Sequence, residues 1–257
     1  GAIFPGLLLV VLYGFWIYLY SIFKPNALPI YKENNDEIIE TSKILKIIFA
    51  PLTLIFIVLG SILFGIATPT ESAALGALGS FFIALAKKIN IKIIKEVSKE
   101  TLRVTSMVFF ILIGASLFSL VFRGFGGDRI IEDFLINFPG GAFYSFLIVM
   151  LIIFLLGFFL DFLQIIFVII PIVGPSLISM GYDPVWLGII IAVNIQTSFL
   201  TPPFGFALFY LRGVAPKSLE TSNIYFGVIP FIIIQIILMI ILFRYPSIIT
   251  WLPSYIK

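Results

Sequence analysis

Two consecutive prolines stand inside a long apolar stretch of this sequence and restrict how it can fold. Pro202 and Pro203 follow Thr201 within residues 185–214, which are otherwise mostly hydrophobic. Proline has no backbone N–H, and its ring clashes with the preceding helical turn, so an ordinary helix cannot run through this point. Pro202 also pushes Thr201 toward an extended conformation. The sequence therefore predicts a discontinuous helix with a break at Thr201.

The composition indicates that this break lies in a membrane. Hydrophobic residues make up 61% of the 257 residues and charged residues 11%, with a mean hydropathy of +1.18. This profile is that of an integral membrane protein. Lipid cannot hydrogen-bond the carbonyls that a broken helix leaves, so protein, an ion or enclosed water must do so. Interrupted helices of this kind line ion and substrate sites in secondary transporters.

Several classes of function are disfavoured by residues that the sequence lacks. It has no cysteine and no histidine, which removes disulfides, thiol catalysis, haem ligation through histidine and most zinc sites. Intramembrane aspartyl catalysis needs two facing carboxylates, and only Asp161 lies deep in an apolar run. The net charge of +3 does not suggest a nucleic-acid partner. A passive channel stays open as an alternative, and conduction without a driving ion gradient is the observation that would distinguish it from a transporter.

The apolar segments predict a chain that crosses the membrane several times. About 20 helical residues span the hydrocarbon core, and we expect crossings at residues 3–23, 47–64, 73–86, 102–122 and 224–243. Lysine-rich residues 24–46 and 87–103 mark the cytoplasmic side, which leaves a short C-terminal tail outside. The chain opens without Met inside a hydrophobic stretch and shows no signal peptide, so we expect it to be part of a longer protein.

Two charged segments show helical spacing of their apolar residues. Residues 87–103 and 123–141 are each predicted to form an amphipathic helix at the membrane interface, on opposite faces of the membrane. Ahead of residues 73–86, Thr68 or Thr70 can cap the next helix, with Glu71 in its first turn. Gly76 and Gly79 then give that helix a small-residue face for close packing.

Residues 142–180 are too long for one crossing and are interrupted at residues 157–161. Two interpretations compete: two full crossings, or one re-entrant hairpin with its tip at Gly157–Asp161. An acid within an apolar run normally faces a cavity or a partner. Asp161 can equally cap the second helix of the hairpin, and the two roles are compatible.

Three separated motifs resemble a known family. Residues 65–74 (Gly-Ile-Ala-Thr-Pro-Thr-Glu-Ser-Ala-Ala), residues 157–175, and residues 194–211 followed by Arg212-Gly213-Val214 are similar to the large membrane subunit of tripartite ATP-independent periplasmic (TRAP) transporters. The similarity extends over essentially the whole chain and corresponds to the C-terminal part of such a subunit. Most of the first of the family's two inverted repeats is missing.

The resemblance implies a fold, a function and partners. The fold would be an all-α integral membrane protein, with a re-entrant hairpin, a discontinuous helix and interfacial arm helices, as half of an inverted-repeat elevator transporter. The function would be sodium-driven import of small organic acids across the bacterial inner membrane. The partners would be a small membrane subunit and a periplasmic substrate-binding protein. Another sodium- or proton-coupled anion transporter of similar architecture is the alternative.

The resemblance also places a sodium site between the hairpin tip and the unwound segment. The expected ligands, mainly backbone oxygens, are those of Gly157, Ser198, Thr201 and Phe204. Sodium prefers hard oxygen ligands, which carbonyls and the Thr201 hydroxyl supply without a full negative charge. The candidate substrate contacts are Asp161, Asn194, Gln196, Thr197, Pro202 and Pro203, with Ser198 as a further donor. We therefore divide the chain into scaffold residues 1–101, a transport repeat 102–214 and a C-terminal membrane helix 215–257.

Overall fold

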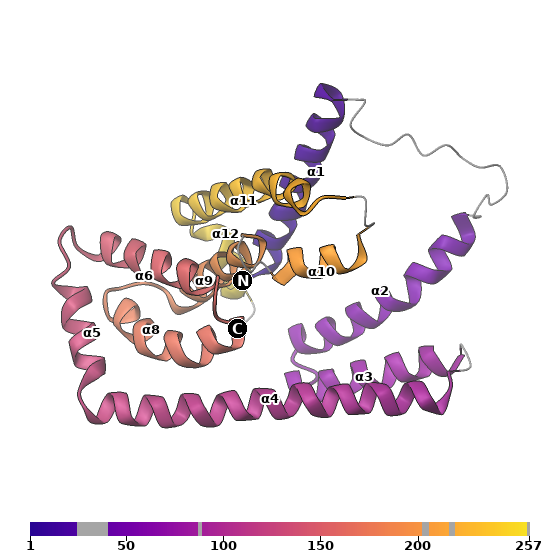
Figure 1. The fold of residues 1–257 in the computed structure, drawn as a ribbon, viewed down its shortest axis with the longest axis horizontal. Coiled ribbons are helices and arrows are strands. Elements are labelled where there is room, and N and C mark those ends of the chain that lie inside the picture. Colours follow the sequence, from indigo (N-terminus) through magenta and orange to yellow (C-terminus); the bar gives the residue numbers. More distant parts are fainter. Residues whose placement is uncertain (25–40, 87–88, 202–205, 216–218, 256–257) are drawn as a thin grey trace. The chain divides into compact units, whose positions relative to one another are not determined.

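The computed structural model describes residues 1–24, 41–86, 89–201, 206–215 and 219–255, and these residues form helices joined by turns, with no strand among them. The chain divides into two compact units, Pro29–Ser106 and a larger unit of Gly1–Leu28 with Met107–Lys257. Each unit is described by itself (Figure 1).

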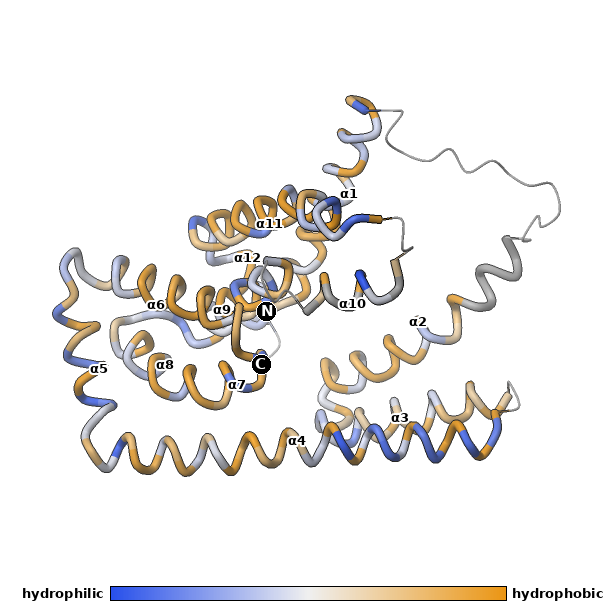
Figure 2. Tube along the Cα trace, viewed as in Figure 1, coloured by the Kyte–Doolittle hydropathy of each residue, from blue (hydrophilic) through white to orange (hydrophobic). Residues whose placement is uncertain are grey.

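Helices of membrane-spanning length confirm the class of protein. Among the described residues, five helices are long and apolar enough to cross a bilayer: Ile3–Phe23, Pro69–Ala86, Ile91–Gly124, Phe162–Ser179 and Thr221–Arg244. Most of the residues in these spans are not buried, and Phe110, for example, is 79% exposed. Figure 2 shows hydrophobic residues along most of these helices. Lipid is the solvent for such surfaces, so the chain is a multi-pass helical membrane protein.

The smaller unit contains a tight helical hairpin. α2 (Thr41–Leu63) packs against α3 (Pro69–Ala86). A Cβ atom on Gly79 would lie 2.3 Å from Cδ1 of Leu54, and one on Gly76 would lie 3.2 Å from Cγ2 of Val58. The predicted small-residue face of α3 is thereby confirmed.

Thr68, and not Thr70, caps α3. Its backbone N–H and its hydroxyl both donate to Oε2 of Glu71 at 2.8 Å, and its Oγ1 accepts from the Glu71 N–H at 3.3 Å. This reciprocal arrangement is a capping box. Deeper between the two helices, the hydroxyls of Ser61 and Ser72 share a hydrogen bond of 2.8 Å.

α4 (Ile91–Gly124) differs from the prediction. We expected an interfacial helix over residues 87–103 and a separate crossing over residues 102–122, but one helix of 34 residues contains residues 91–103 and the whole crossing, while residues 87–88 lie outside the described residues. It measures about 50 Å at 1.5 Å per residue, well beyond the hydrocarbon core. No proline interrupts it, and Thr101 donates its hydroxyl back to the Val97 carbonyl at 2.8 Å. Figure 2 shows the change from its charged first half to its apolar second half.

α5 (Gly127–Ile136) lies within the second predicted amphipathic segment, residues 123–141, but is shorter than predicted, since residues 123–124 belong to α4. Its Leu135 side chain is buried, while Ile130 and Phe134 are exposed. The Ser145 hydroxyl donates to the Leu135 carbonyl at 2.6 Å and joins α5 to α6 (Ala142–Leu156). This hydrogen bond links the end of α5 to the first helix of the next helical hairpin.

Residues 142–179 form a helical hairpin. α6 ends at Leu156, and the return arm consists of α7 (Phe162–Gln164), a π-helical turn η2 (Ile165–Ile169) and α8 (Ile170–Ser179). α6 packs against η2 and α8. The interruption predicted at Gly157–Asp161 is confirmed as the turn of this hairpin.

The helix predicted to be discontinuous ends where the prolines require. α9 (Pro184–Leu200) stops at Thr201, which has the extended angles φ −99° and ψ 127°, and α10 (Phe206–Val214) follows. The effect of Pro202 on the preceding residue explains these angles. α9 lies at the centre of the larger unit and packs against α6 and α11 (Thr221–Arg244).

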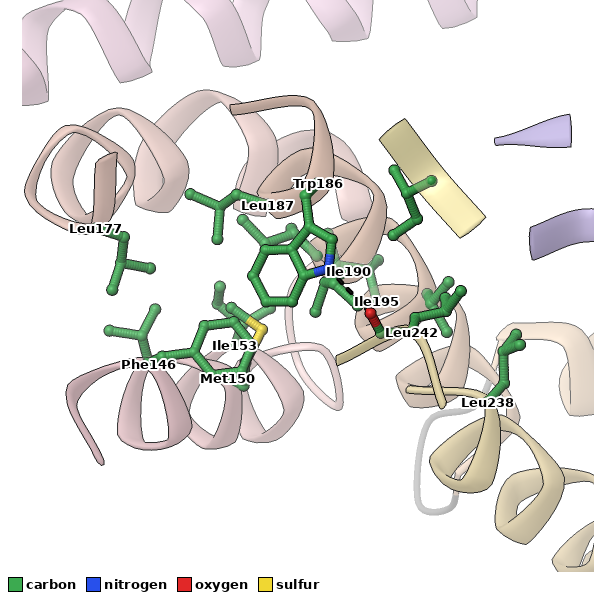
Figure 3. Close-up of a cluster of buried hydrophobic side chains, with 14 of the residues drawn as sticks. Phe146, Met150, Ile153, Leu177, Trp186, Leu187, Ile190, Ile195, Leu238 and Leu242 are labelled. Carbon is green, nitrogen blue, oxygen red and sulfur yellow. Dashed lines mark hydrogen bonds between the residues drawn. The ribbon is translucent and has the colours of Figure 1, made fainter. Parts of the chain in front are cut away.

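Aromatic side chains pack around the N-terminal end of α9. The indole of Trp186 packs with the rings of Phe146, Tyr182 and Phe243. Its N–H donates to the Leu242 carbonyl at 3.0 Å (Figure 3). α1 (Ile3–Phe23) packs on α11. Where we expected only a short tail, α12 (Ser247–Tyr255) packs on α1 and α9, with Ile249 fully buried.

Candidate functional site

The site is built on two parallel helices, α6 and α9. Four contacts join them in the same order along both helices. The Tyr182 hydroxyl, just ahead of α9, donates to the Ala142 carbonyl at 3.0 Å, and the ring of Trp186 packs on that of Phe146. The Asn194 amide donates to the Met150 carbonyl at 2.8 Å, and the Ser198 hydroxyl donates to the Phe154 carbonyl at 3.1 Å. The C-terminal ends of the two helices therefore lie at the same level.

Gly157 makes this meeting of helix ends possible. A Cβ atom built on it would lie 2.4 Å from Cβ and 2.5 Å from Oγ of Ser198, a separation that real Cβ atoms do not adopt. Only glycine permits this close approach of the hairpin turn to α9. The hairpin turn therefore contacts α9 at Ser198, one turn before Thr201, whereas the closer prediction that Gly157 and Thr201 share one ion stays a prediction.

Both the backbone and the side chain of Thr201 form hydrogen bonds with the last turn of α9. Its N–H donates to the Ser198 carbonyl at 3.1 Å, and its hydroxyl donates to the Thr197 carbonyl at 2.9 Å. The hydroxyl oxygen keeps lone pairs that can face a ligand. The side chain is half-buried beside the break.

The electrostatic character of this place follows from the helix ends. Each helix carries a partial negative charge of about half an elementary charge at its C-terminus. Since α6 ends at Leu156 and its cap Gly157 touches Ser198 in the last turn of α9, these two negative ends lie close together, whereas the return arm of the hairpin begins at Phe162 with its positive end. Where the ends of α6 and α9 meet, these two dipoles favour a cation.

Asp161 caps the return arm of the hairpin. Its Oδ1 accepts from the Phe162 N–H at 2.8 Å, and Oε1 of Gln164 accepts from the Asp161 N–H at 3.2 Å, which completes a capping box. The capping interpretation is thereby confirmed. The ring of Phe162 then packs edge-on against Phe199 of α9, with ring centroids 6.0 Å apart.

The structure separates the other predicted residues into two groups. Asn194, Thr197 and Ser198 are buried on the α6 side of α9, because residues three and four apart share one helical face. Gln196 is exposed and lies on a different face of the same helix. Pro202, Pro203 and Phe204 lie outside the described residues.

Two backbone carbonyls that contribute to the site were not predicted from the sequence. The carbonyls of Met150 and Phe154 accept the hydrogen bonds that align α6 with α9, and apolar side chains give no sign of this role. The capping role of Gln164, in contrast, could have been predicted from the sequence. An acid followed three residues later by Glu or Gln resembles a capping box, a pattern that can be read from sequence.

Together, these features define a class of protein. A multi-pass helical membrane protein in which a helical hairpin meets the end of a discontinuous helix has the architecture used by secondary transporters.

Comparison with known proteins identifies the family. Residues 1–248 match the family model described as the tripartite ATP-independent periplasmic transporter, DctM component, and the chain belongs to this family. Its relatives are named as permease subunits of transporters and not as enzymes, and in bacteria this family lies in the inner membrane.

Three relatives illustrate the range of the family. The C4-dicarboxylate TRAP transporter large permease protein DctM of Vibrio cholerae is 32% identical over 79% of this chain and 49% of its own length. The sialic acid large permease SiaM of the same organism is 26% identical over 84% of this chain and 50% of its own. The isethionate permease DctMQ of Oleidesulfovibrio alaskensis is 29% identical over 75% of this chain and 30% of its own. This chain thus spans about half the length of the first two relatives.

Proposed function

We propose that this chain is the C-terminal portion of a sodium-driven permease that imports small organic acids. A periplasmic binding protein would deliver the substrate, and a small membrane subunit would complete the transporter. The membership of the TRAP family supports the general function. The sodium dependence rests on one observation, the contact of Gly157 with Ser198 that joins two negative helix ends.

Sodium suits this place better than a divalent metal ion. The described residues hold no group of three or more Asp, Glu, His or Cys side chains that could bind a metal ion. Neutral oxygens are available instead, from the Thr201 hydroxyl and from carbonyls near the turn at Gly157 and the end of α9. Such a site favours a cation of single charge with hard oxygen ligands.

The same charges suggest why an acid and sodium would travel together. The relatives' names specify C4-dicarboxylate, sialic acid and isethionate, all of which are anions at neutral pH. Negative helix ends repel an anion, so it would bind beside them only after a cation has neutralised them. Sodium bound between Gly157 and Thr201 would therefore raise the affinity for the acid, and by linkage the acid would raise the affinity for sodium.

The hairpin would move with its cargo in an elevator mechanism. The contacts between α6, α8 and α9 make the hairpin and the discontinuous helix one packed body. In this proposal the hairpin is re-entrant, so that its turn at Gly157–Asp161 lies inside the membrane and not at its surface.

The test is sodium-dependent uptake by the complete transporter in proteoliposomes, with the binding protein present. Thr201→Ala should raise the sodium concentration for half-maximal uptake by about five- to a hundredfold, the effect of losing a polar partner of about 1–3 kcal/mol. Thr201→Ser keeps the hydroxyl and should stay near wild type. Uptake that follows a proton gradient without sodium, or an unchanged sodium dependence in Thr201→Ala, would contradict the proposed site.

A further inference from the structure

A cavity lined by both polar and apolar side chains lies away from the hairpin tip, between the last turns of α4, the helix α5 and α8. Its volume is about 310 Å³. Hydroxyl and charged side chains line it from all three helices: Ser119, Arg123, Asp128, Glu132, Ser176 and Ser179.

The charged side chains around this cavity have opposite signs and do not pair with one another. Asp128 and Glu132 are four residues apart and share one face of α5. Arg123 lies in the last turn of α4 and also lines the cavity. Among the described residues, only Arg103 and Glu100 come within 4.0 Å as an ion pair. One cation and two carboxylates thus face a common space without neutralising each other directly.

The position of the cavity places it at the membrane surface. Ser119 and Arg123 belong to the last turns of the apolar helix Ile91–Gly124, and Ser176 and Ser179 to the end of the apolar span Phe162–Ser179. Apolar spans end where the hydrocarbon core gives way to lipid headgroups. Beside the cavity, Phe118 and Val121 are exposed on α4 and offer an apolar surface to acyl chains.

We propose that this cavity binds the zwitterionic phosphoethanolamine headgroup of a membrane lipid. Arg123 would bind the phosphate, for which a guanidinium group has a matching set of donors. The ammonium group would donate its three N–H bonds to Asp128, Glu132 and the serine hydroxyls.

The arrangement predicts an order among lipids. A phosphocholine headgroup has no N–H to donate, and a phosphoglycerol headgroup has no cation to set against two carboxylates. Phosphatidylethanolamine should therefore bind best, and phosphatidylglycerol least well.

The experiment uses the complete permease containing this chain, purified in detergent and analysed by native mass spectrometry with equimolar phosphatidylethanolamine, phosphatidylcholine and phosphatidylglycerol. Wild type should retain phosphatidylethanolamine preferentially. Arg123→Gln should weaken its retention about tenfold, as loss of a charged hydrogen-bond partner does. Asp128→Asn with Glu132→Gln should abolish the preference over phosphatidylglycerol.

Matched controls come from the same helix. Arg129 and Asp133 are exposed on α5 and are not among the residues that line the cavity, so Arg129→Gln and Asp133→Asn should leave lipid retention unchanged. Thermal unfolding of each variant separates loss of the lipid from loss of the fold. Equal effects of Arg129→Gln and Arg123→Gln, or equal retention of all three lipids by wild type, would overturn the proposal. Soluble phosphoethanolamine that displaces the lipid at equal concentration would reassign the cavity to a soluble ligand and contradict the lipid assignment.

Discussion

The side chain of Ser198 occupies the space that any side chain on residue 157 would need, since a Cβ atom there would lie 2.4 Å from Cβ of Ser198. The two residues are 41 positions apart, and their contact brings the hairpin turn to the end of the discontinuous helix. This relationship gives the sharpest test of the site.

Gly157→Ala should destabilise the permease and reduce uptake, because the added methyl group forces α6 and α9 apart. Overpacking of this kind costs about 1–3 kcal/mol. Thermal unfolding in detergent and uptake in proteoliposomes would measure the two effects.

The matched control is Gly188→Ala, which adds the same methyl group to α9 where no atom lies within 4 Å. It should leave both quantities near wild type. Gly157→Ala combined with Ser198→Gly should recover part of the lost stability, since Ser198→Gly removes the clashing atoms. No recovery in the double variant would show that the contact is not the cause.

Substitution of Asp161 separates capping from a direct contact with substrate. Asp161→Ala should lower the free energy of unfolding by about 0.5–2 kcal/mol, the usual effect of losing a helix N-cap. Asp161→Asn retains a capping oxygen and should lose much less stability. If Asp161→Asn nevertheless abolishes uptake at normal stability, its negative charge has a role beyond the cap.

The amide of Asn194 should contribute to the alignment of α6 and α9. Asn194→Ala removes the hydrogen bond to the Met150 carbonyl, which should cost about 0.5–1.5 kcal/mol. Gln196→Ala, two positions away on an exposed face, should leave the unfolding temperature nearly unchanged. Equal destabilisation by both substitutions would be inconsistent with the buried position of Asn194.

In the smaller unit, Gly79→Val should separate α2 from α3, because even a Cβ atom would lie 2.3 Å from Cδ1 of Leu54. We expect a loss of about 1–3 kcal/mol, measured by thermal unfolding. Leu54→Ala should partly rescue Gly79→Val by making room. Gly60→Val, on a face of α2 where no atom lies within 4 Å, serves as the control and should have a smaller effect.

The sequence by itself determined the features that depend on neighbouring residues. Pro202 made Thr201 extended through a steric contact between adjacent residues, and α9 ends there. Asp161 and Gln164 form their capping box within one helical turn, as do Thr68 and Glu71. The membrane-spanning character of helices such as Ile3–Phe23 follows from composition over a single segment. The family motifs could also be recognised without coordinates.

Only the tertiary structure decided which of these local features meet. The parallel alignment of α6 and α9 depends on contacts between residues 40 to 44 positions apart, such as Ser198 with Phe154, and no local pattern encodes that register. The same alignment buries Asn194 and leaves Gln196 outside. The continuity of α4 through residue 102 and the packing of α12 on α9 also escaped prediction. The charge pattern of a helix indicates which part of it is exposed to water. Where a helix ends and what it packs against depend on backbone hydrogen bonds and on contacts with residues that are distant in the sequence.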